Sequence, residues 1–575
     1  MSVCRPFFTG HIDGESLFPF PEMSSDEAET LEILRDSLRR FGRDRVDSRA
    51  IDAEARIPRE VLSGLAELGV FGILVPEEYE GSGASATFYA KAFETLATID
   101  GAIVVTVGAH ESIGLKGILQ FGTEDQKRRF LPALARGEQL AAFALTEPTS
   151  GSDAASIRSR AIWSEERGAW ILNGTKIWIT NGGIADVFTV FAQTTVEREG
   201  ETVDRITAFI VPRSLAGVSS GPEEHKLGIR GSSTTELHFE DVALPPDLVL
   251  GEIGGGFKVA MEVLNSGRLG LASGCVGGMK HLLAEATRNA QEREQFGRPI
   301  AEFELIQEKL AGMALEIYGA ESIVYLTTGL VDRGAEDYSL ESAICKVKAS
   351  EAVWRVVNEA LQIAGGMGYM REYPFERYLR DARINLIFEG TNEILRLYTA
   401  LSGLEAPGEH LKAVARALKD PVKQLGLLTD YARDRARRAL HKPDLPELHP
   451  DVADFAGALP AWVAEFAGTV EWALRRHGRE IIERQMTLER LANAVGDLFL
   501  MAAVISRAEA ARRARPGPAG EAHVARARLI VNEAWRRVRR ELVRVREYPD
   551  NDVRVVAAEV LASGGADLPD VGPPS

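Results

Sequence analysis

The sequence has few cysteines, and the three that it has, Cys4, Cys275 and Cys345, form no CxxC pair and lie near no cluster of histidines. This spacing argues against a disulfide scaffold and a structural zinc site, so we expect a reducing compartment and no bound metal. The chain also lacks an apolar run approaching the roughly 20 residues that span a bilayer. Its formal net charge of −17 argues against non-specific nucleic-acid binding.

A dinucleotide-binding fingerprint is missing as well. Gly251 and the glycines at 254–256 form a glycine-rich stretch, but they do not fit the GxGxxG spacing, and no strand–helix alternation surrounds them. This argues against a parallel nucleotide-binding sheet. The residues between Arg5 and Arg35 are rich in Asp and Glu and contain no Lys or Arg. Because transit peptides are acid-poor and Arg-rich, we expect a cytoplasmic protein without a presequence.

What the sequence does contain is apolar material, 45% of 575 residues, enough for three or four packed domains. Helical spacing dominates from residue 25 to about 140, whereas 141–245 has short β-rich runs with Asn173-Gly174 as a hairpin turn. A four-helix bundle is expected next, with long helices at about 257–291, 304–332 and 339–364 and a shorter one from Asn392. We therefore predict an α+β fold that is mostly helical.

The predicted domain limits follow these changes of pattern: an N-terminal helical domain at 1–140, a β-rich middle domain at 141–255, a helical bundle at 256–402 and a C-terminal helical extension at 403–575. The extension begins with a basic stretch made of Lys412, Arg416, Lys419, Lys423, Arg433, Arg435, Arg437 and Arg438. Basic amphipathic helices bind anionic bilayers, but the same pattern suits a solvated helix face. Both interpretations stay open.

Two segments suit a bound planar or anionic group. Ala144–Asp153 is rich in small and hydroxyl residues, which supply donors for an anion or a flavin edge, although a capped loop is the plainer interpretation. In Thr175–Gly183, Trp178 and Thr180 would point to the same face of a strand. A heterocycle could pack there, but an ordinary core tryptophan fits the pattern about as well.

A candidate general base stands near the end of the predicted bundle. Glu389 follows two apolar residues and precedes a glycine turn that leads into a helix capped by Thr391 or Asn392. A carboxyl among buried apolar side chains can have its pKa raised toward neutrality, as a general base needs. The alternative is a glutamate that only complements the positive end of the helix dipole.

Together these segments resemble the acyl-CoA dehydrogenase family. The family's two signature segments correspond to Ala144–Ser156 and to Gln362–Asp381, which reads QxxGGxGYxxExxxxRxxxD, and its RxxFG motif corresponds to Arg293–Gly297. Gly108–Gly114, Leu250–Arg268 and the region beyond residue 402 are most similar to the very-long-chain type, which carries a C-terminal helical extension. The resemblance covers nearly all of the chain.

The resemblance implies an FAD-dependent enzyme that oxidises a fatty acyl-CoA, of long chain, to the trans-2-enoyl-CoA. Glu389 would take the α-proton while the β-hydrogen leaves as hydride, and an oxyanion hole would stabilise the enolate. Contacts to the FAD of the same subunit are implied for Thr146, Trp178, Thr180 and Thr391. Contacts to the FAD of a neighbouring subunit are implied for Arg293, Phe296, Gln362 and Gly366. Contacts to the CoA ester are implied for Ser152, Asn265 and Arg268.

Partners and substrate length follow from the same resemblance. It implies a homodimer that passes electrons to an electron-transferring flavoprotein, in the cytoplasm or peripheral on the inner face of the membrane. Some short branched-chain relatives carry the base just before the CoA-binding arginine; here that position is Gly267, which leaves Glu389 as the base and makes room for a long chain. Ile103, Val104 and Val105 add bulk on another helix and leave the upper length open.

Two other functions stay open. One is a non-catalytic assembly or scaffold protein on the same fold, against which an intact Glu389 argues. The other is an acyl-CoA oxidase or flavin monooxygenase, in which oxygen reaches the reduced flavin. Fast reoxidation of the product-bound flavin in air would favour that second alternative.

Overall fold

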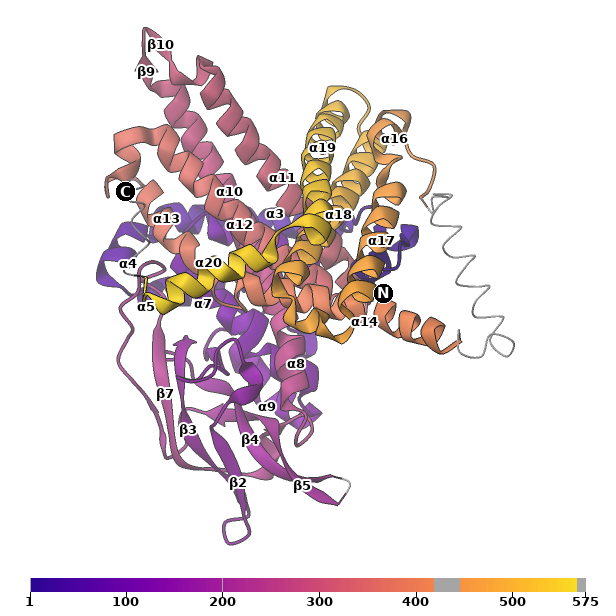
Figure 1. Cartoon of the computed structure of the whole chain (residues 1–575). Coiled ribbons are helices and arrows are strands. Elements are labelled where there is room, and N and C mark those ends of the chain that lie inside the picture. The colour runs from indigo at the N-terminus through magenta and orange to yellow at the C-terminus, as the bar shows by residue number, and fades with distance from the viewer. Residues whose placement is uncertain (1, 199, 418–444, 566–575) are drawn as a thin grey trace, which may run out of the picture.

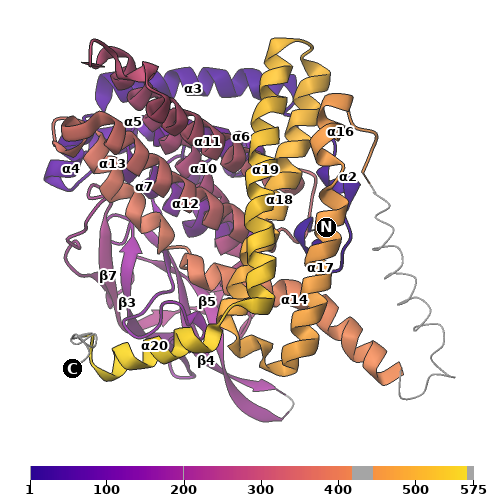
Figure 2. The ribbon, with the colours of Figure 1, turned by 45° about the horizontal axis from the view of Figure 1, so that its top comes forward.

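The computed structural model describes residues 2–198, 200–417 and 445–565. Helices form most of it, and the strands from β1 to β8 form one large sheet below the long helices in the view of Figure 1. Three of the extension's helices stand beside the bundle as a separate upright group (Figure 2). The predicted α+β fold, mostly helical, is confirmed.

The N-terminal part consists of short helices and turns. Ser24, Asp100 and Thr123 each cap the helix that follows by accepting a hydrogen bond from its backbone N–H groups. The elements are α1 (Cys4–Phe7), α2 (Gly14–Leu17), α3 (Ser25–Arg45), α4 (Ser48–Glu54), α5 (Arg59–Glu67), η1 (Glu77–Tyr79), α6 (Ala86–Ala97), α7 (Gly101–Gly108), the π-helical turn η2 (Ala109–Gly114), α8 (Lys116–Phe121) and α9 (Glu124–Ala135).

The strands from β1 to β8 form one mixed sheet with the order β6-β7-β3-β2-β4-β5-β8, in which β1 adds beside β4, and β9 and β10 form a separate two-stranded sheet. Its pairs are antiparallel except β1–β4 and β2–β4. The strands are β1 (Ala141–Ala144), β2 (Arg160–Ser164), β3 (Ala169–Thr180), β4 (Val187–Arg198), β5 (Glu201–Pro212), β6 (Val218–Ser220), β7 (Thr234–Leu244) and β8 (Val249–Leu250), with the short turns η3 (Ala154–Ser156) and η4 (Pro246–Leu248) between them. Residues 187–192 of β4 are all buried, as expected of a central strand covered on both faces.

The predicted hairpin at Asn173-Gly174 is wrong, because both residues lie inside the unbroken strand β3. The pairing register with β7 shifts here, and the Asn173 side chain bonds to β7. Its amide donates to Asp241 Oδ1 at 3.1 Å, and its Oδ1 accepts from the Asp241 N–H at 2.9 Å. An Asn-Gly pair therefore makes a bulge here rather than a turn. The chain reverses earlier, between β2 and β3, where Gly168 has a φ of 55°.

The long helices lie where the periodicity predicted them. α10 (Gly256–Glu292), α11 (Glu304–Asp332) and α12 (Ser339–Ala364) agree with the predicted limits to within one residue. α14 (Asn392–Ala417) is longer than predicted, and the predicted domain limit after residue 402 falls inside it. The connecting elements are β9 (Glu294–Gln295), β10 (Arg298–Pro299), η5 (Ile300–Glu302), η6 (Gly365–Tyr369), α13 (Phe375–Ala382) and η7 (Arg383–Leu386).

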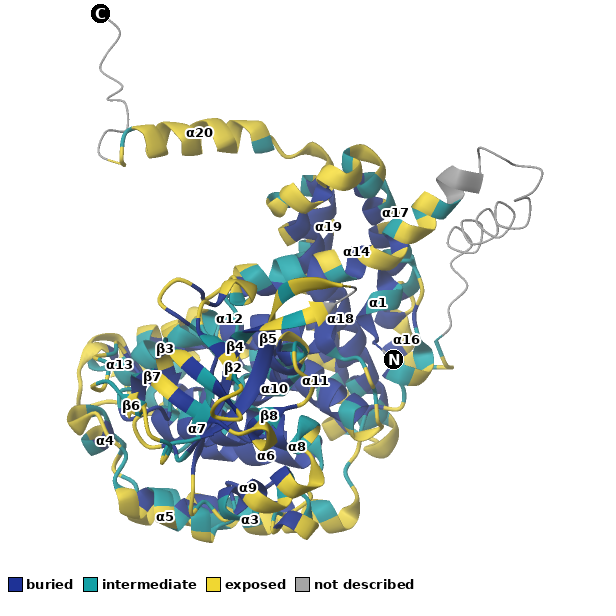
Figure 3. Ribbon diagram, turned by 90° about the horizontal axis from the view of Figure 1, so that it is seen from below, coloured by how far each residue is buried: buried dark blue, intermediate teal, exposed yellow. Residues whose placement is uncertain are grey.

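The extension packs through α18 against the bundle and the extension's other helices, and most residues of α18 are buried (Figure 3). Its last helix, α20, has no buried residue and projects from the body. The elements are α16 (Pro450–Ala456), α17 (Leu459–His477), η8 (Gly478–Glu483), α18 (Gln485–Ala514), α19 (Pro518–Glu547) and α20 (Asp550–Ala562). Most of the predicted basic stretch, from Lys419 to Arg438, lies outside the described residues, so its membrane contact stays a prediction.

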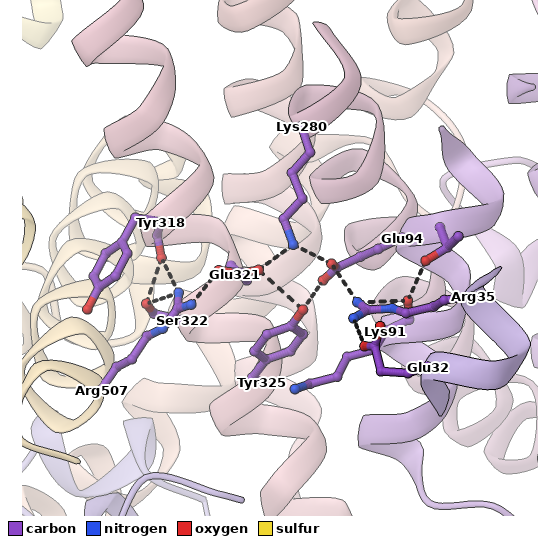
Figure 4. A network of polar contacts seen from close by, with 11 residues as sticks. Glu32, Arg35, Lys91, Glu94, Lys280, Tyr318, Glu321, Ser322, Tyr325 and Arg507 are labelled. Atoms are coloured by element: carbon purple, nitrogen blue, oxygen red, sulfur yellow. Dashed lines mark hydrogen bonds and ion pairs between the residues drawn. The ribbon is translucent and has the colours of Figure 1, made fainter. Parts of the chain in front are cut away.

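A buried charge network joins the extension to the helical bundle and to α6 (Figure 4). Arg507 of α18 lies 2.5 Å from Glu321 of α11, and Lys280 of α10 contacts both Glu321 and Glu94 of α6. Although burial opposes it, Arg507 and Lys280 lower the pKa of Glu321 to about 2. With Arg35 of α3, which lies 4.0 Å from Glu94, three cations thus surround two buried carboxylates, and one of the cations comes from the extension.

Two helical stretches, Gly101–Phe121 and Gln485–Ala514, are apolar and long enough to cross a membrane by length and composition alone. The sequence analysis did not detect them. Within the fold, 61% and 89% of their most apolar windows are buried. They pack as core helices, and this apolar composition by itself is weak support for a membrane span.

Candidate active site

Glu389 lies at the junction of two cavities. The first, which we call the narrow cavity, has a volume of about 130 Å³ and lies between α7 and α10. The second, the wide cleft, has a volume of about 930 Å³ and lies between the sheet, α10 and the start of α14. Glu389 lines both, so a molecule that extends from one cavity into the other passes its carboxyl group.

The backbone at Glu389 takes an uncommon conformation. Its φ is 59° and that of Gly390 is 90°, so two successive residues are left-handed between η7 and α14. The Glu389 Oε2 atom is buried and has no hydrogen-bond partner. It rests against α10 at Gly267, where an added Cβ would lie 2.8 Å from Oε2 and 2.6 Å from Ile113 Cγ2. Glycine at 267 therefore leaves the space in which the carboxylate sits.

Electrostatics place this carboxyl near its midpoint of ionisation at neutral pH. Burial raises the pKa of Glu389 to about 7, against the lowering effect of Arg268 and Lys346. The Arg268 Nε donates to the Glu389 carbonyl at 3.3 Å and its Nη1 to Asn265 Oδ1 at 3.0 Å. A carboxyl of this kind can accept a proton from carbon or return one without a large energetic mismatch.

The wide cleft brings together seven of the predicted residues. Apart from Glu389, they are Thr146, Ser152, Trp178, Thr180, Asn265 and Arg268. Trp178 has a φ of 56° and is 63% exposed, so its ring is presented to the cleft instead of the core. The Thr146 carbonyl accepts the Ile177 N–H at 3.0 Å, which ties the loop after β1 to β3. One flat ring, three hydroxyl side chains and a guanidinium thus line the same space.

Five predicted residues do not line either cavity. Arg293 and Phe296 lie at the β9–β10 hairpin, where Phe296 is 95% exposed, and Gln362 and Gly366 are exposed at the end of α12 and in η6. Thr391 caps α14, because its Oγ1 accepts the Ile394 N–H at 3.3 Å, and it stands between two lining residues of the wide cleft. The first four meet no part of their own cleft and are accessible to a second molecule.

The narrow cavity is lined by glycines on one face of α10. Gly267, Gly270, Gly274 and Gly278 recur at a spacing of three or four residues and therefore share that face. A Cβ added at Gly278 would meet no atom within 4 Å, and one at Gly274 would first meet Val104 of α7 at 3.7 Å. Missing side chains thus open an apolar channel that leads away from Glu389.

Two ionisable residues near the cavities were not predicted as site residues by the sequence analysis. Asp381 lines the narrow cavity, where burial raises its pKa to about 7. Lys346 is fully buried behind Glu389. Its position could have been found, because Lys346 shares helical spacing with the apolar residues Ala349 and Val353. A lysine on the apolar face of a helix is expected to be buried, provided that the helix itself is predicted in the right place.

Comparisons with known proteins agree along the chain. The descriptions "Acyl-CoA dehydrogenase, N-terminal domain", "middle domain" and "C-terminal domain" match residues 28–138, 142–242 and 254–403, and "ACAD9/ACADV, C-terminal domain" matches 450–566. The very long-chain specific acyl-CoA dehydrogenase, mitochondrial, of Bos taurus is 45% identical over 518 residues, which cover 88% of this chain and 79% of that relative.

Solved structures extend the comparison to three dimensions. An acyl-CoA dehydrogenase complexed with FAD from Bacillus anthracis has a TM-score of 0.79 and 32% identity, and covers 98% of this chain and 96% of its own. A structure described as an electron transferring flavoprotein of Acidaminococcus fermentans has a TM-score of 0.62 and 37% identity, over 67% of this chain and 99% of its own. From the four matched segments and these relatives, the chain belongs to the acyl-CoA dehydrogenase family.

Proposed function

We propose that the protein is an FAD-dependent dehydrogenase that converts a long-chain fatty acyl-CoA to its trans-2-enoyl-CoA, with Glu389 as the base. The observation that carries this proposal is the position of Glu389. Its Oε2 is buried and unpaired, and Glu389 lines both cavities together with Ile113, Thr180 and Phe388. A thioester at that point would place its α-carbon beside the carboxylate, with its acyl chain in one cavity and CoA in the other.

The residues of the wide cleft fit FAD. The exposed ring of Trp178 and the hydroxyls of Thr146 and Thr180 suit a planar heterocycle with polar edges, and a Cβ added at Gly151 would meet nothing within 4 Å. When bound there, FAD supplies the acceptor for the β-hydrogen, which leaves as hydride. Thr391, at the start of α14, is proposed for the diphosphate, because helix N-termini attract anions.

The protein's own part in the reaction is to move one proton. The bond between the α-carbon and its hydrogen breaks, and the proton goes to the Glu389 carboxylate, while the electron pair shifts toward the thioester carbonyl. The Glu389 N–H is proposed as a donor to that oxygen. Arg268 and Lys346 lie close enough to affect the Glu389 charge, and they also favour negative charge at the reacting carbons. Burial keeps water from competing for the proton.

The narrow cavity supports the proposed preference for substrates with long acyl chains. Its glycine-lined face on α10 continues past Glu389 to Gly278, which leaves room for an extended apolar chain. Burial of each methylene contributes about 0.8 kcal/mol, so a channel lined by carbon favours long substrates over short ones. Val104 and Val105 narrow it from α7. Ser152 and Asn265, in the wide cleft, are proposed to contact the CoA ester.

The exposed predicted residues support a proposal about how the protein assembles. Arg293, Phe296, Gln362 and Gly366 would contact the FAD of a second subunit in a homodimer, which explains why they face away from their own cleft. An electron-transferring flavoprotein is the proposed electron acceptor, supported by the similarity to the Acidaminococcus fermentans structure. We also propose the four domain limits predicted from the sequence. The proposed location is cytoplasmic and peripheral on the membrane, whereas the Bos taurus relative is named as mitochondrial.

The test is an anaerobic titration of the FAD-bound protein with acyl-CoA esters from butyryl to eicosanoyl, following loss of the oxidised flavin band. The proposal predicts bleaching that is strongest with long chains. Strongest bleaching with short chains would keep the reaction and overturn the chain-length assignment. No bleaching at any length, in protein that retains FAD, would overturn the function.

A further inference from the structure

Two lysine side chains in the described part of the chain are completely buried, Lys176 and Lys346. Lys176 has an ionic partner, since its Nζ lies 2.7 Å from Glu147 Oε1. Lys346 contacts only neutral acceptors: its Nζ donates to the Gly390 carbonyl at 2.7 Å and to Asn392 Oδ1 at 2.8 Å. No carboxylate among the described residues makes an ion pair with it. A buried ammonium is unfavourable without a counter-charge, so the structure must supply one nearby.

Both acceptors of Lys346 lie directly after the base. The first closes the left-handed pair Glu389–Gly390, and the second is the first residue of α14. Left-handed φ values at a glutamate persist only when the surrounding structure holds them. From the separate helix α12, Lys346 therefore holds the backbone directly after the left-handed pair and the side chain that begins α14. The Glu389 carbonyl itself accepts from Arg268.

The carboxylate placed to supply this counter-charge is Glu389, because Lys346 binds the carbonyl of the residue directly after it. Burial lowers the pKa of Lys346 to about 8, and the charge of Glu389 opposes that lowering. The other groups that face this pair are Arg268 and Cys275 of α10, Tyr89 of α6 and Glu393 of α14. Arg268 adds a second positive charge, and Glu393 is exposed to solvent, where its field is screened. The interaction between Lys346 and Glu389 thus acts in a poorly screened site.

We propose that Lys346 is a positioning residue of the reaction, which holds the turn at Glu389–Gly390 and supplies a counter-charge to the Glu389 carboxylate. The proposal rests on the proposed function where it names Glu389 as the base. The charge interaction does not depend on turnover, and it can be measured in protein without substrate.

The experiment follows the carboxyl band of Glu389 by infrared difference spectroscopy of the FAD-bound protein across pH, with the band assigned by its loss in Glu389→Gln. Lys346→Met removes the charge and the donors, Lys346→Gln keeps a donor without the charge, and Lys346→Arg keeps the charge. We expect Lys346→Met and Lys346→Gln to raise the pH at which the band disappears by about one unit or more. Lys346→Arg should stay close to the wild type.

A matched control is available on the same helix. Lys348 lies two residues further along α12, with its Nζ 2.7 Å from Asp497 Oδ1 in the extension. Lys348→Met should leave the Glu389 band unmoved. If Lys346→Met does not fold, Lys346→Gln carries the test alone. Identical titration in wild type, Lys346→Met and Lys346→Gln, or an equal shift in Lys348→Met, would overturn the proposal.

Flavin reduction by acyl-CoA separates the two parts of the role. Lys346→Gln should lose about tenfold in rate at pH 7 and recover at high pH, because only the charge is missing. Lys346→Met should recover less, because the turn is also released. A shifted infrared band in a protein that no acyl-CoA bleaches would mean that the charge interaction holds and the proposed function fails.

Discussion

The narrow cavity and the wide cleft share Glu389 but are built from different residue types. The narrow cavity lies between α7 and α10, whose facing residues are mainly glycine and valine, whereas the wide cleft presents hydroxyls, an indole and a guanidinium. The apolar side raises the pKa of the shared carboxyl, and the polar side holds groups that bind and orient. One carboxylate can serve as a base here because it stands between an apolar and a polar environment.

The largest expected effect comes from removing the shared group. Glu389→Gln keeps the shape of both cavities but cannot accept the α-proton, so flavin reduction by a long-chain acyl-CoA should slow at least about a thousandfold. FAD content and product binding should stay within a few-fold of wild type. Glu393→Gln, an exposed glutamate in the first turn of α14, is the control. A Glu389→Gln variant that retains a tenth of the wild-type rate would rule out Glu389 as the base.

The second effect concerns stability. The pKa of Glu389 rises from 4.5 to about 7 on folding, so the folded state binds the extra proton between these values and stability falls as pH rises through that window. Above pH 7 the buried carboxylate destabilises the fold by about 3 kcal/mol. Glu389→Gln should therefore lose less stability than wild type as the pH rises from 4.5 to 8. The same pH dependence of the unfolding temperature in the two proteins would contradict the raised pKa.

A third prediction fills the narrow cavity and leaves the wide cleft unchanged. In Gly278→Leu the new side chain would enter the open space beside α10. Reduction by long-chain esters should fall about tenfold to a hundredfold, while reduction by butyryl-CoA should change little. Gly468→Leu, at an exposed glycine of α17 with equal room, is the control. An equal loss with every chain length would mean that the acyl chain does not reach Gly278.

The smallest expected effect is on the polar side. Trp178→Ala removes an aromatic surface from the wide cleft and should weaken FAD retention about threefold to tenfold, without a change in chain-length preference. Dialysis followed by flavin absorbance measures the retained cofactor. Trp163→Ala, on the neighbouring strand β2 opposite Trp170, should retain FAD as the wild type does. A change in chain-length preference in Trp178→Ala would show that the two cavities are not independent.

The helices could be predicted because local spacing determines them. The limits of α10, α11 and α12 follow from a period of 3.6 residues, and the structure places them within one residue. The Asn173-Gly174 hairpin failed because the same pair also suits a bulge. Which of the two forms depends on the partner strand β7, and the sequence of β3 alone does not contain that information.

The sequence predicted those candidate site residues that match a family motif. It did not predict the charged residues whose burial depends on tertiary packing. Seven predicted residues meet at the wide cleft. Both buried cations were missed: Arg507 because arginine is ordinarily a surface residue, and Lys346 because its helical spacing with Ala349 and Val353 was not used. Their burial depends on partners far away in the chain, such as Gly390 for Lys346 and Glu321 for Arg507. Residues that balance charge across domains are therefore the part that the sequence hides best.

The most direct test of the central claim measures proton abstraction alone. With the flavin reduced beforehand, hydride transfer is blocked, and a long-chain acyl-CoA in D₂O can only exchange its α-hydrogen at the base. The account predicts deuterium at the α-carbon with wild type, detected by mass spectrometry, and none above the solution rate with Glu389→Gln. Equal exchange in the two proteins would contradict the assignment of Glu389 as the base.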